Sequence, residues 1–175
     1  MSNYRRDRVS GGTWFFTVAV ADRKSDLLIR EIDILRDAVR RVRHDWPFRI
    51  DAWVVLPDHL HTVWTLPADD HDFSTRWRLI KSHFSRALPR QEIVSRSRQR
   101  KAERGLWQRR FWEHRIRNDR DYRAHLDYVH YNPVKHGHVT RVADWPYSSF
   151  HRDVSRGLYP NDWGGGVDLD GRFGE

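Results

Sequence analysis

Two apolar segments separated only by Pro57-Asp58 constrain the fold of this chain more than any other feature. The first runs from Phe48 to Leu56 and the second from His59 to Leu66, and both are rich in the β-branched and aromatic residues that favour strands. A break this short cannot hold the crossover that parallel strands need, so the two strands must pair antiparallel. The sequence therefore predicts a β-hairpin whose return strand begins at His59.

This return strand opens with His59-Leu60-His61. Residues two apart on a strand point to the same face, so the two imidazoles project together while Leu60 faces the other side. Neutral imidazole is the commonest metal ligand, and the pair is suited to half of a metal site; two histidines that merely pack are the alternative. The chain has no cysteine, so any further ligand would be histidine, carboxylate, amide or water.

The remaining apolar patterns predict a mixed α+β fold. We expect a strand over residues 13–20, a helix over 27–43, a helix from Phe73 to just before Pro89, a strand over 106–116 and a third helix after Asn118. Asn118 is a typical N-cap, and the third helix should run to about Tyr131 and end near Asn132, because the residue before a proline disfavours helix. This order of elements indicates a mainly antiparallel central sheet, of the ferredoxin-like kind, with helices packed on its faces.

Length and hydropathy predict a single domain over residues 1–175, with a loose tail from about residue 160. The chain has 175 residues, of which 38% are hydrophobic, enough for one sizeable core. No apolar run approaches the roughly 20 residues that span a bilayer, and residues 1–6 do not begin a signal peptide. We therefore expect no membrane association and a cytoplasmic location near the nucleoid.

The third helix places one tyrosine among polar groups. At about 100° per residue, Asp121, His125, Tyr128 and Asn132 fall within a wedge of roughly 60°, beside a separate apolar stripe. Tyr128 and Asn132 are one turn apart and are able to serve one site. His125 shares their face and is a candidate to support the residues of that site through hydrogen bonds. A half-buried tyrosine and a helix-ending asparagine without chemistry are the alternatives.

Tyr131 is the rival nucleophile, about 60° away around the helix. We prefer Tyr128 because it shares a face with Asn132. His130, about 200° from Tyr128, should point away from the site as a surface or packing residue. Glu113, His114 and the remaining histidines are assigned no function.

Positive charge is concentrated in one stretch. The formal net charge is +8, and residues 86–110 contain nine lysines and arginines against two glutamates. A solvated loop at about 89–105 is the simple interpretation, but the nine tryptophans and the overall basicity favour contact with nucleic-acid phosphates. Candidate DNA-binding residues are Arg96, Arg98, Arg100, Lys101, Arg109 and Arg110, with Arg76, Arg78 and Lys81 on the second helix and Tyr4, Arg5 and Arg6 on an N-terminal arm.

The histidine pair, the tyrosine helix and the basic stretch together fit phosphodiester chemistry. A phenol is a poor nucleophile until its proton leaves, and its ordinary pKa is near 10. A divalent cation held by two imidazoles and an amide oxygen is able to orient a phosphate and neutralise its developing charge.

Three blocks carry a resemblance to a known family: residues 53–61 (WVVLPDHLH), 111–114 (FWEH) and 127–137 (DYVHYNPVKHG). The sequence resembles, over nearly its whole length, the single-tyrosine HUH (His-hydrophobe-His) transposases, and most closely their branch associated with repetitive extragenic palindromes (REP). Related insertion-sequence enzymes have glutamine where this chain has Asn132. The stretch around residues 90–104 looks like an insertion relative to the family pattern.

The resemblance implies an activity, a set of site residues and a substrate. It implies that Tyr128 attacks a DNA phosphodiester to form a 5′-phosphotyrosine and a free 3′-OH, and that His59, His61 and Asn132 hold Mg²⁺ or Mn²⁺. It also implies single-stranded DNA hairpins as substrates and a monomeric protein. Two alternatives are a hairpin-binding regulator of the same fold with little cleavage, and a metal-dependent phosphodiesterase that uses activated water.

Overall fold

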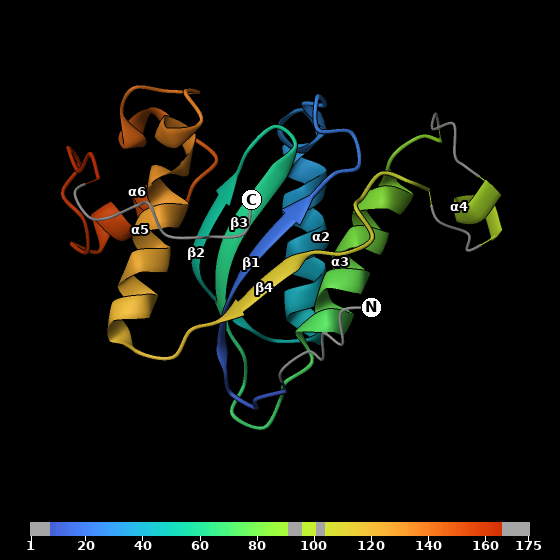
Figure 1. Cartoon of the computed structure of the whole chain (residues 1–175), viewed down its shortest axis with the longest axis horizontal. Coiled ribbons are helices and arrows are strands. Elements are labelled where there is room, and N and C mark those ends of the chain that lie inside the picture. The colour runs from blue at the N-terminus through green and yellow to red at the C-terminus, as the bar shows by residue number, and fades with distance from the viewer. Residues whose placement is uncertain (1–7, 91–95, 101–103, 166–175) are drawn as a thin grey trace, which may run out of the picture.

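The fold is an α+β arrangement around one antiparallel sheet, as the sequence predicts. The structure is a computed structural model that describes residues 8–90, 96–100 and 104–165. Its four strands lie in the order β2-β3-β1-β4, with helices on both faces (Figure 1). The elements are β1 Thr13–Ala19, α1 Leu27–Arg30, α2 Ile32–Asp45, β2 Arg49–Val55, β3 His59–Thr65, α3 Phe73–Ala87, α4 Arg96–Arg100, β4 Trp112–Arg115, α5 Asp119–Lys135, the 3-10 turn η1 Val142–Asp144 and α6 Phe150–Ser155.

The predicted hairpin is confirmed, and it puts the histidine strand in the interior of the sheet. β2 and β3 pair antiparallel, with Val54 opposite His61, and β3 begins at His59. On its other side β3 pairs with β1, where Thr17 lies opposite His61. β1 also pairs with β4, where Thr17 lies opposite Trp112. Since opposed residues share a face, Val54, His61, Thr17 and Trp112 form one row across the sheet.

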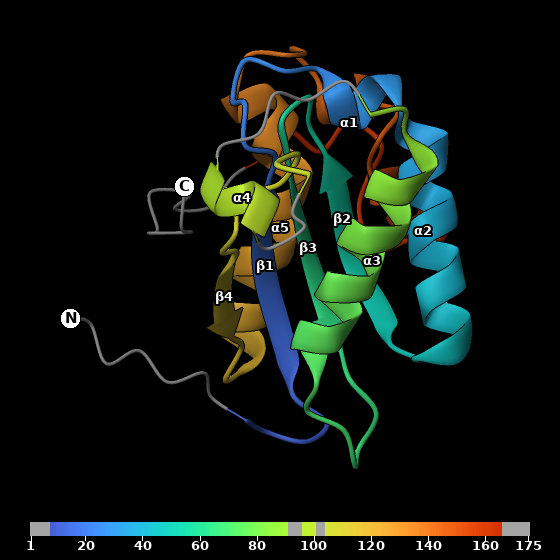
Figure 2. The same cartoon turned by 90° about the vertical axis from the view of Figure 1, so that its right-hand side faces the viewer.

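The two faces of the sheet bury different cores. α2 and α3 pack side by side on one face (Figures 1 and 2), over a cluster that includes Trp14, Phe16 and Trp64. α5 covers the opposite face, where Phe15, Val63 and Tyr128 pack together. No helix among the described residues is long and apolar enough to cross a membrane.

Three predicted elements differ from the structure. The helix expected over 27–43 is two helices, α1 and α2, broken at Glu31; the apolar spacing continues across the break and could not reveal it. The strand expected over 106–116 is regular only from Trp112 to Arg115, although a bridge between Val20 and Trp107 extends its path. The basic loop contains a short helix, α4.

The predicted end of the tyrosine helix is wrong. α5 begins after the Asn118 cap as expected, but it continues through Pro133 to Lys135. A proline near the end of a helix removes only one late hydrogen bond, and buried packing of Val129 and Pro133 holds the last turn. The helix stops at Gly137, where the amides of Gly137 and His138 bond back to the carbonyls of Val134 and Pro133, both at 2.9 Å.

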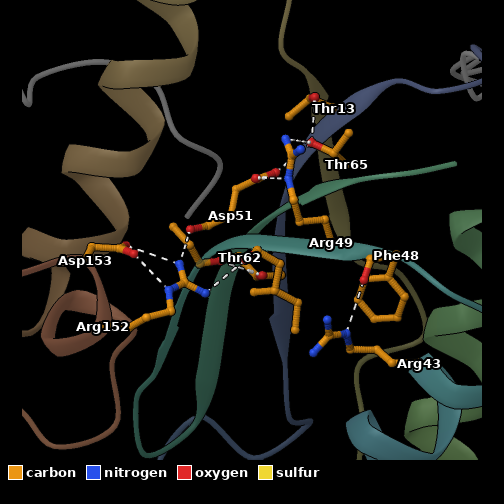
Figure 3. A network of polar contacts seen from close by, with 11 residues as sticks. Thr13, Arg43, Phe48, Arg49, Asp51, Thr62, Thr65, Arg152 and Asp153 are labelled. Carbon is orange, nitrogen blue, oxygen red and sulfur yellow. Dashed lines mark hydrogen bonds and ion pairs between the residues drawn. The ribbon is translucent and has the colours of Figure 1, made fainter. Parts of the chain in front are cut away.

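The outer edge of β2 is covered. The main-chain N–H and C=O of Trp53 bond to the Oγ and N–H of Ser149, and the N–H of Val55 bonds to the carbonyl of Tyr147. Further along the strand, the guanidinium of Arg152 donates to the carbonyls of Ile50 at 3.0 Å and Asp51 at 2.5 Å, as Figure 3 shows for Asp51. These contacts occupy polar groups that an edge strand otherwise offers to another chain.

Candidate active site and metal centre

His59 is held by a carboxylate on its outer nitrogen. Its Nδ1 lies 2.7 Å from Asp58 Oδ1, and Asp58 Oδ2 lies 2.8 Å from Arg23 Nε. Because a carboxylate only accepts, Nδ1 carries the proton and Nε2 presents its lone pair to the interior. His59 Nε2 is buried without a hydrogen-bond partner among the described residues. Burial lowers the pKa of His59 against the opposing effect of Asp58, so the ring is in the neutral form that binds metals.

His61 is oriented in the same way by a hydroxyl. Its Nδ1 lies 2.9 Å from Thr17 Oγ1, on the neighbouring strand, and its Nε2 is buried. The two imidazoles project to one face, as the spacing predicts, with ring centroids 4.9 Å apart. The ring of His136, just past the end of α5, lies 5.3 Å from that of His59 at the rim of this site.

Tyr128 lies directly against this pair. Its side chain is buried, and its ring is 5.2 Å from the ring of His61 and 5.9 Å from that of Phe15. Lys135, two turns further along α5, donates to the Tyr128 hydroxyl at 3.3 Å and places its Nζ 4.8 Å from the ring centre. An ammonium at this position stabilises negative charge on the phenol oxygen as its proton leaves.

Asn132 lies one turn beyond Tyr128 on the same face of α5. It is fully buried, and neither its Oδ1 nor its Nδ2 has a hydrogen-bond partner within the described part of the chain. Buried amides are almost always bonded, and leaving one unmet costs about 1–3 kcal/mol. Asn132 lies on α5 between Tyr128, whose ring contacts His61, and His136, whose ring contacts His59. Its orphaned atoms and the lone pair of His59 fit a bound ion with His59, His61 and Asn132 as its ligands.

A second cluster of histidine and carboxylate was missed by sequence reasoning. Asp121 accepts from His114 Nε2 at 3.0 Å and lies 3.0 Å from His125 Nδ1, and the two imidazoles stack with centroids 4.7 Å apart. His125 Nδ1 also bonds to the main-chain carbonyl of Asp121 at 2.8 Å. The three side chains could hold a metal, but their polar atoms already bond to one another, which makes His59, His61 and Asn132 the better site. A helical pattern could not place His114, which comes from β4.

The carboxylate of this cluster stays ionised. Burial opposes ionisation of Asp121 most strongly, but hydrogen bonds from His114 and the N–H of Arg117 outweigh it and lower the pKa. Burial lowers the pKa of His125. His125 thus lies about one turn from Tyr128, and its bonds to Asp121 fix the orientation of its ring.

The two rejected candidates lie elsewhere. Tyr131 packs its ring against Gly165, where an added Cβ would lie 2.8 Å from the ring carbons. His130 is fully buried and bonds to Asp153 Oδ2 at 3.1 Å, so it is a packing residue and not a surface one. Sequence reasoning also missed Thr17, Asp58 and Lys135; only Asp58 is signalled in the sequence, by its position next to His59.

A basic groove of about 840 Å³ runs between α3 and residues 104–111. None of the described residues that line it is acidic, and its basic lining is Arg78, Lys81, Arg86, Arg90, Arg104 and Arg109. Arg78 and Arg109 are exposed there. Lys81 donates to the carbonyl of Gln108 at 3.1 Å and lies over the rings of Trp107 and Phe111.

The structure corrects one DNA-binding candidate, and some of the others lie outside the described residues. Arg76 is buried, and its guanidinium bonds to Asp70 and to the carbonyls of Trp46, Pro47 and Asp72, so it braces the protein and does not face a ligand. Arg96, Arg100 and Arg110 are exposed. Tyr4, Arg5, Arg6, Lys101 and the side chain of Arg98 lie outside the described residues.

Comparison with known proteins gives the family to which this fold belongs. The chain is 54% identical over 167 residues to the REP-associated tyrosine transposase of Escherichia coli K12, covering 95% of this chain and 93% of that protein. It is 49% identical over 170 residues to a putative REP-associated tyrosine transposase of Haemophilus influenzae Rd, covering 97% of each. A search of family models found no match.

A solved structure described as a REP-associated tyrosine transposase bound to a REP hairpin has a TM-score of 0.87 and 52% identity, over all of this chain and 98% of the other. The chain belongs to the family of REP-associated tyrosine transposases. It is therefore an enzyme of a family that acts on DNA.

Proposed function

We propose that this protein is a metal-dependent endonuclease and strand transferase for single-stranded DNA that folds into REP-type hairpins. The observation that carries the proposal is the contact of the Tyr128 ring with His61, together with the buried, unbonded atoms of His59 and Asn132. A solved relative is described as bound to a REP hairpin, which supports the substrate class.

In the proposed reaction Tyr128 is the nucleophile. Its oxygen attacks a phosphorus of the DNA, the bond to the 3′-oxygen breaks, and a 5′-phosphotyrosine forms. The phenolic proton leaves, and the departing 3′-oxygen takes up a proton to become a 3′-OH. Lys135 donates to the tyrosine oxygen during attack, and again when that oxygen is the leaving group in strand transfer.

The proposed metal ligands are His59, His61 and Asn132, with Mg²⁺ or Mn²⁺ as the ion. When bound, the ion supplies charge neutralisation and orientation at the phosphoryl oxygens. Asp58 and Thr17 hold the two imidazoles with their Nε2 atoms inward, and such partners typically change metal affinity 10–100-fold.

The proposed DNA-binding surface is the basic groove beside α3, with Arg78, Lys81 and Arg109, and with Arg110 next to it. The remaining candidates, Arg96, Arg98, Arg100, Lys101 and the arm Tyr4, Arg5 and Arg6, stay proposals. We further propose that the protein acts as a monomer, because Arg152 and residues 147–149 occupy the edge of β2. The alternative function is a hairpin-binding regulator with little cleavage, for which the groove alone would suffice.

Trapping a covalent adduct on a labelled hairpin tests the proposal. With Mg²⁺ or Mn²⁺, the unaltered protein should form an adduct that survives denaturation, and Tyr128→Phe should form none while binding the hairpin within a few-fold. Tyr131→Phe is the matched control and should react normally. His59→Ala and His61→Ala should be folded and inactive. Normal adduct from Tyr128→Phe would reassign the nucleophile, and binding without any adduct in the unaltered protein would establish the regulator.

A further inference from the structure

Trp112 exposes a large aromatic surface on the edge strand β4. Its side chain is 36% exposed, whereas most tryptophans among the described residues are more deeply buried. Its exposed indole offers a flat π-face to a ligand.

Two imidazole rings, those of His114 and His125, lie behind this exposed indole, each nearly parallel to the ring before it. The rings of Trp112 and His114 have centroids 5.9 Å apart with 5° between their planes, and those of His114 and His125 are 4.7 Å apart with 15°. Asp121 bonds to both imidazoles, so the planes of the two histidines are fixed. The series runs from the surface at Trp112 to the interior at His125, and a flat group would continue it on the outer side.

The series lies beside the reacting groups. Trp112 is on the same cross-strand row as Thr17 and His61, two strands from the histidine, or about 10 Å at the usual strand spacing. Phe15 contacts the rings of both Trp112, at 5.7 Å, and Tyr128, at 5.9 Å. One aromatic side chain thus separates the exposed indole from the nucleophile, a separation that one or two nucleotides of single-stranded DNA span.

We propose that Trp112 is a stacking site for an unpaired nucleobase of the DNA next to the cleaved phosphate, with His114, His125 and Asp121 fixing its backing. The proposal rests on the proposed function, because it assumes a DNA substrate. A base offers the flat π-face that would extend the ring series. Stacking tolerates any base, so Trp112 would set the position of the strand and not its sequence.

A double-mutant cycle between protein and DNA tests the site. Hairpins with a single abasic position, moved along the unpaired flank, are compared in binding to the unaltered protein and to Trp112→Ala, in EDTA so that cleavage does not interfere. One position should weaken binding to the unaltered protein about tenfold, or about 1.4 kcal/mol. At that position the loss should be nearly absent in Trp112→Ala, and Trp112→Tyr should retain most of it.

Two further variants keep the test decisive. Trp112→Leu retains apolar area without a π-face and should behave like Trp112→Ala, which separates stacking from a folding defect checked by thermal unfolding. Trp46→Ala removes another exposed tryptophan, at the end of α2, and should leave the abasic profile unchanged. If no position shows coupling to Trp112 while hairpins bind normally, this inference is wrong and the proposed function stands. If the unaltered protein binds no hairpin, the proposed function fails first.

Discussion

At the scale of single residues, the partner on the outer nitrogen decides what each buried histidine is able to do. His59 and His61 each have an oxygen at Nδ1, from Asp58 and Thr17, which turns Nε2 inward, where we propose that it binds the metal. His130 instead directs Nε2 to Asp153 and is used for packing. The same residue type, equally buried, therefore has different chemistry depending on one hydrogen bond.

Lys135 should matter for the chemical step more than for binding. Lys135→Met removes the donor to the Tyr128 oxygen, and we expect the cleavage rate with bound hairpin to fall about tenfold or more, because a hydrogen bond to developing charge is lost. Lys135→Arg should recover most of that rate. Single-turnover cleavage and equilibrium binding are measured side by side; a loss in affinity as large as the loss in rate would make Lys135 a phosphate contact instead.

How far the site follows from the sequence depends on whether its groups share one element. The pairs His59–His61 and Tyr128–Asn132 each lie on one strand or helix, so spacing alone placed them on common faces. Thr17 comes from β1, and only the register of the sheet sets it opposite His61. His114 comes from β4, and only the packing of α5 on the sheet brings it to Asp121. Arg76 has the same charge as its neighbour Arg78, and its burial follows from packing against residues 46–48, which no local pattern encodes.

At the scale of elements, α5 shows that a glycine and not a proline ends the helix. Pro133 is tolerated within the last turns. Gly137 adopts φ +71°, which residues other than glycine rarely adopt, and this left-handed conformation ends the helix. The prediction from sequence gave the proline too much weight. The extra turn carries Lys135 back over the ring of Tyr128, the proposed nucleophile.

Gly137→Ala should therefore lower stability through backbone strain alone. Nothing lies within 4 Å of an added Cβ, so no clash contributes. Left-handed backbone costs a non-glycine residue about 1–2 kcal/mol, and we expect a loss of that size in the free energy of unfolding, measured by urea denaturation. Gly137→Asn should lose less, since asparagine tolerates this conformation. Equal stability of all three proteins would mean that the helix end rearranges.

At the scale of the whole molecule, two arginine-rich grooves compete as the DNA-binding surface. The second, of about 740 Å³, lies along the edge of β2 and contains Arg36, Arg40, Arg43, Arg49, Arg152 and Arg156. Its charge is partly neutralised, because Asp51 and Asp153 line it and Arg36 and Arg40 pair with Asp33 and Asp37. The groove beside α3 has no acidic residue in the part of its lining that the structure describes, and it should hold the stronger positive potential. Net charge alone, which the sequence supplies, does not distinguish the two.

The salt dependence of hairpin binding separates these grooves. Each phosphate that a cation neutralises contributes about −0.7 to −0.9 to the slope of log affinity against log salt concentration. Replacing Arg78, Lys81 and Arg109 together by glutamine should therefore make the slope shallower by about 2, as well as weakening binding. The matched control replaces Arg36, Arg40 and Arg43, three exposed arginines of the other groove. It should leave the slope nearly unchanged, because Arg36 and Arg40 are paired with Asp33 and Asp37 and the groove also contains Asp51 and Asp153. The opposite result would place the DNA along the edge of β2. Arg152, which donates to the carbonyls of Ile50 and Asp51, would then also have to contact a phosphate.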